Sequence, residues 1–135
     1  MNDIDLLLDT DVLIDVLREH HPALRWAEEN GALRVGIPVV VRMEILQGAR
    51  NLSELQAIAQ QLDRYTTLHL EAEDSARALE WFEQFRLSRG IGILDCFVAA
   101  IACRLKKPLC TFNDKHYRSL QTVNLLAPYS RSTTP

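Results

Sequence analysis

The segment LLLDTDVLI, residues 6–14, carries the strongest structural signal in the sequence. An apolar run that ends at Leu8 is typical of a buried strand. The apolar residues within Val12–Leu17 recur at helical spacing, and Thr10 or Asp11 is suited to cap the first turn of a helix. The segment therefore predicts a strand that passes into a helix through a polar corner.

The same alternation of strand and helix continues along the rest of the chain. Further strands are expected over Leu33–Ile37, Thr66–Leu70, Leu109–Phe112 and Thr122–Leu126. Helices are expected over 22–30, 38–48, 51–65, 72–89, 95–107 and 115–120. This alternation predicts an α/β fold with a mainly parallel sheet covered by helices on both faces. Ligands bind such sheets beyond the carboxyl ends of the strands.

Length and composition limit the number of domains and the class of protein. A chain of 135 residues has room for one domain of ordinary size. With 47% hydrophobic and 24% charged residues, the chain can bury a normal interior, which excludes general disorder. We expect one domain over residues 1–129 and a mobile tail over residues 130–135.

Charge and patterning bear on partners and location. The net charge of −3 gives no broad cationic surface for nucleic acid, although cations held by clustered carboxylates would attract phosphate. No apolar run approaches the ~20 residues of a membrane span. The start, MNDIDLLLD, has acids where a secretory signal has Lys or Arg, so we expect a cytoplasmic protein. Three cysteines without a CxxC motif favour neither a disulfide framework nor a zinc site.

Several acidic residues occupy places where a charge needs an explanation. Asp9 closes the first strand, Asp95 opens a strongly apolar helix, and Asn113-Asp114 follows a late strand. Glu44 lies inside an apolar helix, where its neighbours one turn away offer no partner for a carboxylate. Because a buried unpaired charge is costly, we expect Glu44 to face a cavity or an ion.

Carboxylates that converge at one sheet edge repel one another and raise each other's pKa unless a cation holds them. Ligands that are oxygen only favour Mg²⁺ or Mn²⁺ over zinc. Such ions activate water and shield the charge of a phosphodiester. The acidic positions therefore favour a metal-dependent hydrolase acting at phosphorus.

Four blocks in order along the chain carry a resemblance to a known family. They are LLDTDVLI at 7–14, VRMEILQG at 41–48, GIGILD at 90–95 with Ala99-Ala100, and TFN at 111–113. This pattern resembles the PIN-domain ribonucleases and, more narrowly, the VapC-type toxins of type II toxin–antitoxin pairs. The resemblance implies a Rossmann-like PIN domain, Mg²⁺ or Mn²⁺ at an acidic cluster, and endonucleolytic cleavage of RNA to 5′-phosphate and 3′-hydroxyl ends. It also implies a cognate antitoxin, and a homodimer or a larger assembly with that antitoxin.

The resemblance assigns roles to individual positions. The family's acidic, metal-binding and catalytic positions fall on Asp9, Glu44 and Asp95. Thr10 falls on the small hydroxyl residue that supports the first acid, and Asp11 on a position that is more often Asn or Ser.

The fourth acidic position of the family departs from the pattern. Asn113 occupies it, and Asp114 comes one residue later, either as a replacement ligand or as a cap on the following short helix. Basic residues that could contact RNA phosphates are Arg42, Lys115, His116 and Arg118.

Other readings fit parts of the sequence. A haloacid-dehalogenase-like phosphatase would use Asp9 of the DTDV motif as a nucleophile, but its acidic metal motif should follow Thr111 rather than precede it. A non-catalytic receiver-like signalling domain would need a phospho-accepting Asp at the end of a middle strand, and the strand expected over Thr66–Leu70 ends in none. A third alternative is a PIN scaffold that binds RNA or protein without cutting it. The intact acids Asp9, Glu44 and Asp95 argue against this alternative.

Overall fold

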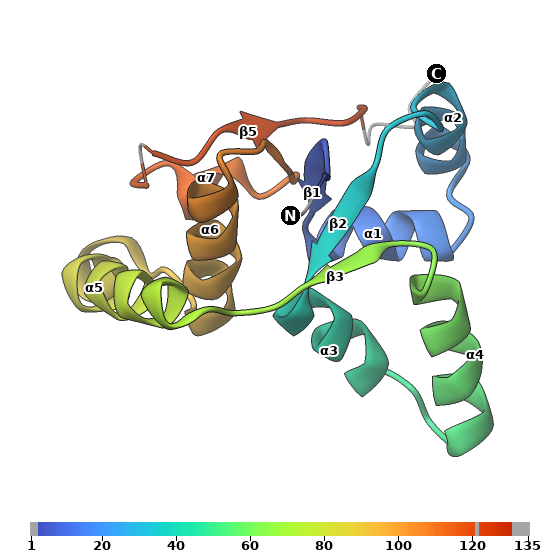
Figure 1. Ribbon diagram of the computed structural model, residues 1–135, viewed down its shortest axis with the longest axis horizontal. Helices are drawn as coiled ribbons and strands as arrows, with labels where there is room; N and C mark the ends of the chain where they lie inside the picture. The colour runs from blue at the N-terminus through green and yellow to red at the C-terminus, as the bar shows by residue number, and fades with distance from the viewer. Residues whose placement is uncertain (1–2, 121, 131–135) are drawn as a thin grey trace.

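The central sheet has five strands, all parallel, in the order β3-β2-β1-β4-β5 (Figure 1). The computed structural model describes residues 3–120 and 122–130. The strands are β1 (Leu6–Leu8), β2 (Val35–Pro38), β3 (Thr66–Leu68), β4 (Leu109–Cys110) and β5 (Leu125–Leu126). The predicted α/β fold with a parallel sheet is confirmed.

The first strand lies at the centre of the sheet and is fully buried, as its unbroken apolar run predicts. Leu7 pairs with Gly36 of β2 on one side and with Leu109 of β4 on the other. At Gly36 an added Cβ would lie 2.7 Å from Cδ1 of Leu68, so the close approach of side chains here requires glycine. Because β1 and β4 are paired in parallel, their carboxyl ends lie side by side.

Helices connect the strands and pack on both sides of them. They are α1 (Thr10–Leu17), α2 (His21–Glu29), α3 (Val39–Gln47), α4 (Leu52–Leu62), α5 (Ala72–Arg89), α6 (Ile93–Leu105) and α7 (Asp114–Tyr117). In Figure 1, α5, α6 and α7 lie to the left of the central strands, and α1, α2 and α4 to the right. The apolar helix α6 packs against α5 and α3 and supplies much of the core.

Several helix starts differ from the prediction by one or two residues, and those of α1 and α6 concern the acids. The N-cap of α1 is Asp9, whose side chain accepts a hydrogen bond from the backbone N of Thr10, so the expectation of Thr10 or Asp11 was wrong. The backbone is still extended at Asp9, which places the next two residues inside the first turn. Helix α6 begins at Ile93, so Asp95 lies in its first turn and does not open it.

A buried ion pair joins α5 to α6. Asp74 is only 1% exposed, and both of its carboxylate oxygens accept hydrogen bonds from Nε of Arg104, at 2.9 and 3.0 Å. The Asp74 carboxylate also accepts a bond from the backbone N of Glu71, which completes a capping box at the start of α5. This pair fixes the position of α6, the helix that carries Asp95.

Two of the sequence predictions concern membrane-spanning segments and the C-terminal tail. Across residues 3–120 and 122–130 there is no helix with the length and apolar character of a membrane span. The tail expected over residues 130–135 lies, from residue 131 onward, outside the described residues.

Candidate active site

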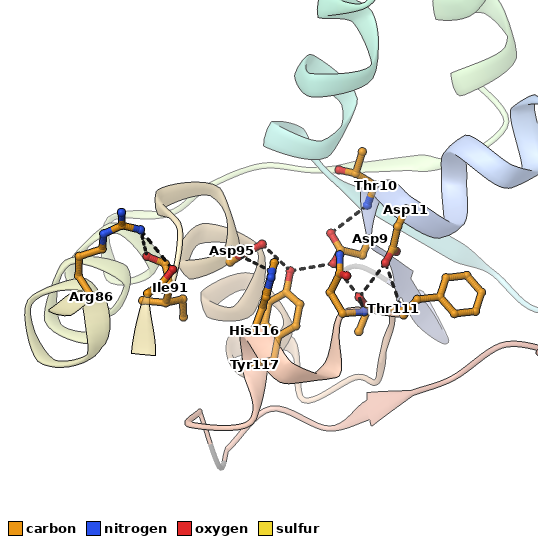
Figure 2. A network of polar contacts seen from close by, with 12 residues as sticks. Asp9, Thr10, Asp11, Arg86, Ile91, Asp95, Thr111, His116 and Tyr117 are labelled. Carbon is orange, nitrogen blue, oxygen red and sulfur yellow. Dashed lines mark hydrogen bonds and ion pairs between the residues drawn. The ribbon is translucent and has the colours of Figure 1, made fainter. Parts of the chain in front are cut away.

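Side chains from the ends of β1 and β4 and from α6 and α7 meet at the carboxyl edge of the sheet (Figure 2). Asp9, which follows β1, is only 6% exposed. Its Oδ1 accepts a hydrogen bond from the backbone N of Thr10 at 2.9 Å. Its Oδ2 accepts bonds from Oγ1 of Thr111 at 2.9 Å and from the hydroxyl of Tyr117 at 2.8 Å. Asp9 is thus a buried carboxylate held from three sides.

One hydroxyl connects Asp9 to Asp95. The Tyr117 hydroxyl, which lies 2.8 Å from Oδ2 of Asp9, lies 3.2 Å from Oδ1 of Asp95 (Figure 2). A phenol has one proton to donate, so the two carboxylates share it. The structure therefore brings together two acids that the sequence separates widely, within the reach of a single oxygen atom.

The second oxygen of Asp95 contacts the neighbouring residue of α7. Nδ1 of His116 lies 3.0 Å from Oδ2 of Asp95, and the imidazole is about half exposed. His116 and Tyr117 therefore hold the Asp95 carboxylate from two adjacent positions of one short helix. His116, expected as an RNA contact, lies beside an acid of the cluster.

Glu44 approaches the same cluster from α3. Its side chain is exposed and lines an open pocket of about 500 Å³ together with Asp95. Partial burial raises the pKa of Glu44, and the negative charges of Asp9 and Asp95 raise it further, whereas a hydrogen bond with the Thr10 side chain lowers it. The structure thus exposes Glu44 instead of burying it among apolar side chains. It lines the pocket and interacts electrostatically with both other acids.

Burial and the neighbouring charge of Asp95 affect the ionisation of Asp9 and Tyr117. Burial raises the pKa of Asp9, and the charge of Asp95 adds to this, against the hydrogen bonds from Tyr117, Thr10 and Thr111. Burial and the two neighbouring carboxylates also raise the pKa of the Tyr117 hydroxyl. The phenol therefore stays protonated and remains a hydrogen-bond donor.

Asp11 supports the site from outside the acid cluster. Its Oδ2 accepts a hydrogen bond from the backbone N of Phe112 at 3.0 Å and lies 3.5 Å from Oγ1 of Thr111. Asp11 thereby ties the loop after β4 to the start of α1. This loop in turn places Thr111, whose hydroxyl holds Asp9.

The structure separates the two candidates for the fourth acidic position. The backbone N of Asn113 donates to Oγ1 of Thr111 at 3.0 Å, which places this residue beside the Thr111–Asp9 contact. The Asp114 carboxylate instead accepts a bond from Arg118 at 2.7 Å on the surface of α7, and this interaction lowers the pKa of Asp114. The structure therefore does not join Asp114 to the acid cluster, and it pairs Arg118 with that carboxylate.

Arg42 also lies away from the acids. Its guanidinium donates to Asp63 at 2.9 Å and to the carbonyl of Ala59 at 3.3 Å, so it ties α3 to α4. Arg42 and Glu44 are two positions apart in α3, which places them on different faces of the helix. Lys115 is exposed on α7.

Three residues that sequence reasoning did not select also belong to the site. Tyr117 looked like an ordinary aromatic of a short helix, and nothing in the sequence marks its hydroxyl as a bridge. Thr111 stood in the TFN block, two residues before Asn113, and this spacing was the available signal. Arg86 of α5 lines the same pocket as Glu44 and Asp95.

The donor set suits a hard divalent cation. Asp9, Asp95 and Glu44 offer only carboxylate oxygens, the ligands that Mg²⁺ and Mn²⁺ prefer, and their mutual repulsion is what a cation would relieve. In the described part of the chain, no three His, Cys, Asp or Glu side chains form a ready-made metal site. The exposed Glu44 side chain would have to turn toward the pair.

Solved structures with the same fold include several toxin–antitoxin complexes. A toxin–antitoxin complex from Klebsiella pneumoniae has a chain with 21% identity and a TM-score of 0.73, and the match covers 93% of this chain and 98% of that one. VapBC-1 from nontypeable Haemophilus influenzae gives 20% identity, a TM-score of 0.76, and coverage of 91% and 97%. VapBC2 from Rickettsia felis, bound to a DNA fragment from its promoter, gives 19% identity and a TM-score of 0.74, and the match covers 90% of this chain and 96% of that one.

The sequence comparisons give a family and no curated relative. No curated protein matches the sequence. The family profile of the PIN domain matches residues 6–120, which includes the segments that carry Asp9, Glu44 and Asp95 and extends past Tyr117. Because this match covers most of the chain, the protein belongs to the PIN domain family.

Proposed function

We propose that this protein is a Mg²⁺- or Mn²⁺-dependent endoribonuclease and the toxin of a cytoplasmic type II toxin–antitoxin pair of the VapBC kind. The family is one of nucleases, and the observation that carries the finer proposal is the shared hydroxyl. Asp9 and Asp95 accept hydrogen bonds from one Tyr117 oxygen, and Glu44 interacts electrostatically with both acids. Three carboxylates so arranged attract a divalent cation.

Each residue of the cluster has a distinct part in the proposed reaction. Asp9, Asp95 and Glu44 would hold the cation, which when bound supplies an activated water and neutralises phosphate charge. Thr111 and Tyr117 orient Asp9 through their hydrogen bonds. Asn113 is better placed than Asp114 to assist, because Asp114 is paired with Arg118.

The proposed partners follow from the fold and from the chemistry of the pocket. The similar structures from K. pneumoniae and H. influenzae are toxin–antitoxin complexes, which supports a cognate antitoxin here. A pocket with Glu44 and Asp95 in its wall would accept an arginine of such an antitoxin in competition with the cation. We further propose a homodimer, or a larger assembly with antitoxin, as the resting state.

The alternative functions fit the structure less well. A haloacid-dehalogenase-like phosphatase needs its acidic metal motif after Thr111, whereas Asp95, which neighbours Asp9 in the structure, comes before Thr111 in the chain. Receiver-like domains have the strand order 2-1-3-4-5. This sheet has the order β3-β2-β1-β4-β5, with the first strand in the middle.

Cleavage assays test the proposal and separate it from a phosphatase. The purified protein should cut structured RNA in Mg²⁺ or Mn²⁺ and not in EDTA, and should leave p-nitrophenyl phosphate intact. Asp9→Asn and Asp95→Asn should abolish cutting, because each removes a charge that holds the cation. Asp63→Asn, which removes an acid bonded to Arg42 outside the cluster, is the matched control. Full RNA cleavage by either cluster variant, or metal-independent cleavage by the wild type, would overturn the proposal.

A further inference from the structure

We propose that the pocket between the end of α5 and the start of α6 binds a backbone phosphate of single-stranded RNA next to the site of cleavage, and that Arg86 is the residue that holds it. This inference rests on the proposed ribonuclease function. It adds a substrate-binding residue to a site whose other functional groups are acids.

The lining of the pocket includes one cationic and two anionic side chains. Its volume is about 500 Å³, and its walls include Glu44 and Asp95 from the acid cluster and Arg86 from the last turns of α5. Within residues 3–120 and 122–130, the Arg86 guanidinium forms no ion pair, although acids line the same pocket. Its positive charge is therefore available to an anion that enters the pocket.

The protein backbone fixes the Arg86 guanidinium in place. Nη1 donates hydrogen bonds to the carbonyl oxygens of Gly90 at 3.2 Å and Ile91 at 3.0 Å (Figure 2). Gly90 has a left-handed backbone, with φ of 69°, which ends α5 and turns the chain back beneath the arginine. A guanidinium has five N–H groups, so Nε and Nη2 keep donors for a ligand. Because the side chain is already ordered, binding costs less conformational entropy.

Phosphate is the ligand that this group recognises best. The planar guanidinium matches two phosphate oxygens, and the charge-assisted bonds are stronger than neutral ones. The carboxylates that line the same pocket repel a free anion, so the phosphate must belong to a ligand that also engages the cation of the acid cluster. An RNA strand cut at the cluster meets this requirement, because its successive phosphates pass both groups.

The remaining wall of the pocket suits a nucleotide. Ile93 and Leu94, in the first turn of α6, are 60% and 41% exposed despite their apolar side chains. Apolar surface beside a charged group provides contact for a ribose or base whose phosphate binds the charge. These contacts carry no base-specific hydrogen bonds, so the pocket should accept RNA of varied sequence.

RNA binding without cleavage tests this role. Fluorescence anisotropy of a labelled single-stranded RNA, with Ca²⁺ in place of Mg²⁺ so that a cation bound by carboxylate oxygens is present, gives the slope of log K against log salt between about 50 and 200 mM salt. Arg86→Gln should weaken binding by about tenfold at the lower salt, the effect of one charge-assisted bond, and reduce the slope by about 0.7. Arg89→Gln, on the same last turn but lining a different pocket, is the matched control and should leave the slope unchanged.

A second measurement on the wild type does not depend on the folding of a variant. Phenylglyoxal modifies arginine side chains, and mass spectrometry locates the products. Bound RNA should protect Arg86 and leave Arg89 reactive. Equal slopes for the two glutamine variants, or equal modification of Arg86 with and without RNA, would overturn the inference. A wild type that cuts no RNA would instead overturn the proposed function, so the two failures are distinguishable.

Discussion

Tyr117→Phe removes one oxygen atom and tests how Asp9 and Asp95 are held. The phenyl ring still fills its place in the core, where Tyr117 is 1% exposed. The hydroxyl bonds to Asp9 at 2.8 Å and to Asp95 at 3.2 Å are lost. Asp9 keeps its bonds from Thr10 and Thr111, so its carboxylate is not left without donors.

These contacts set the size of the effect on stability. A hydrogen bond to a charged group contributes about 1.5–3 kcal/mol. One proton is shared between two acceptors, and Asp9 retains other donors, so the loss should fall at the lower end of this range. We expect the free energy of unfolding at neutral pH to decrease by about 2 kcal/mol.

The effect should depend on pH with a definite sign. The pKa of Asp9 is raised in the folded protein, so ionisation of Asp9 removes stability as pH rises through that raised pKa. The Tyr117 bond opposes this shift, because it lowers the pKa of Asp9. Without the bond the pKa rises further. The variant should therefore lose most stability at neutral pH and less in acid, where Asp9 is protonated in both proteins.

Urea unfolding at neutral and acidic pH measures the difference in the free energy of unfolding between the wild type and Tyr117→Phe. Titration calorimetry with Mn²⁺ measures the affinity of each protein for the proposed metal. Residues that orient metal ligands typically contribute about 10–100-fold in metal affinity, so Tyr117→Phe should weaken Mn²⁺ binding by that factor. Tyr129→Phe is the control, because it removes a phenol–carboxylate bond to Asp15, outside the cluster. A Tyr117→Phe protein with wild-type stability at neutral pH, or with a larger loss in acid, would refute this reasoning.

Other changes test the fold that positions the site. Arg104→Ala leaves a buried aspartate without its counter-charge and should lower the free energy of unfolding by about 3–5 kcal/mol, whereas Arg50→Ala, at an exposed pair, should cost less than about 0.5 kcal/mol in the same urea experiment. Gly36→Ala should cost about 1–3 kcal/mol, because its Cβ would overlap a leucine side chain, and an unchanged melting temperature would contradict this. Burial raises the pKa of Cys110 to about 12, so a thiol reagent should label the less buried Cys103 first, and equal rates would contradict it.

The architecture was predictable because local patterns and topology agree. The buried run that ends at Leu8 and the helix after it predicted β1 and α1, and the segment over 72–89 forms α5 with the predicted bounds. Parallel strands bring their carboxyl ends to one edge. For that reason Asp9, after β1, meets Thr111, after the neighbouring strand β4. Asp95 follows no strand, and the packing of α6 brings it to Asp9.

The details of the site depend on side chains whose roles only tertiary structure reveals. Tyr117 is an aromatic residue on a four-residue helix, and sequence cannot distinguish a buried ring from a ring whose hydroxyl joins two acids. Asp114 and Arg118 stand one helical turn apart and pair locally, which removes both from the cluster. Arg86 is one of two arginines in the last turn of α5, and the turn at Gly90 decides which of them is anchored.

Anomalous diffraction from crystals of the protein grown with Mn²⁺ tests most directly whether the acids hold a metal. We expect a manganese peak among the carboxylates of Asp9, Glu44 and Asp95, at metal–oxygen distances of about 2.0–2.3 Å, and no such peak in Asp95→Asn crystals. A peak elsewhere with this cluster left empty, or an undiminished peak in the variant, would contradict it.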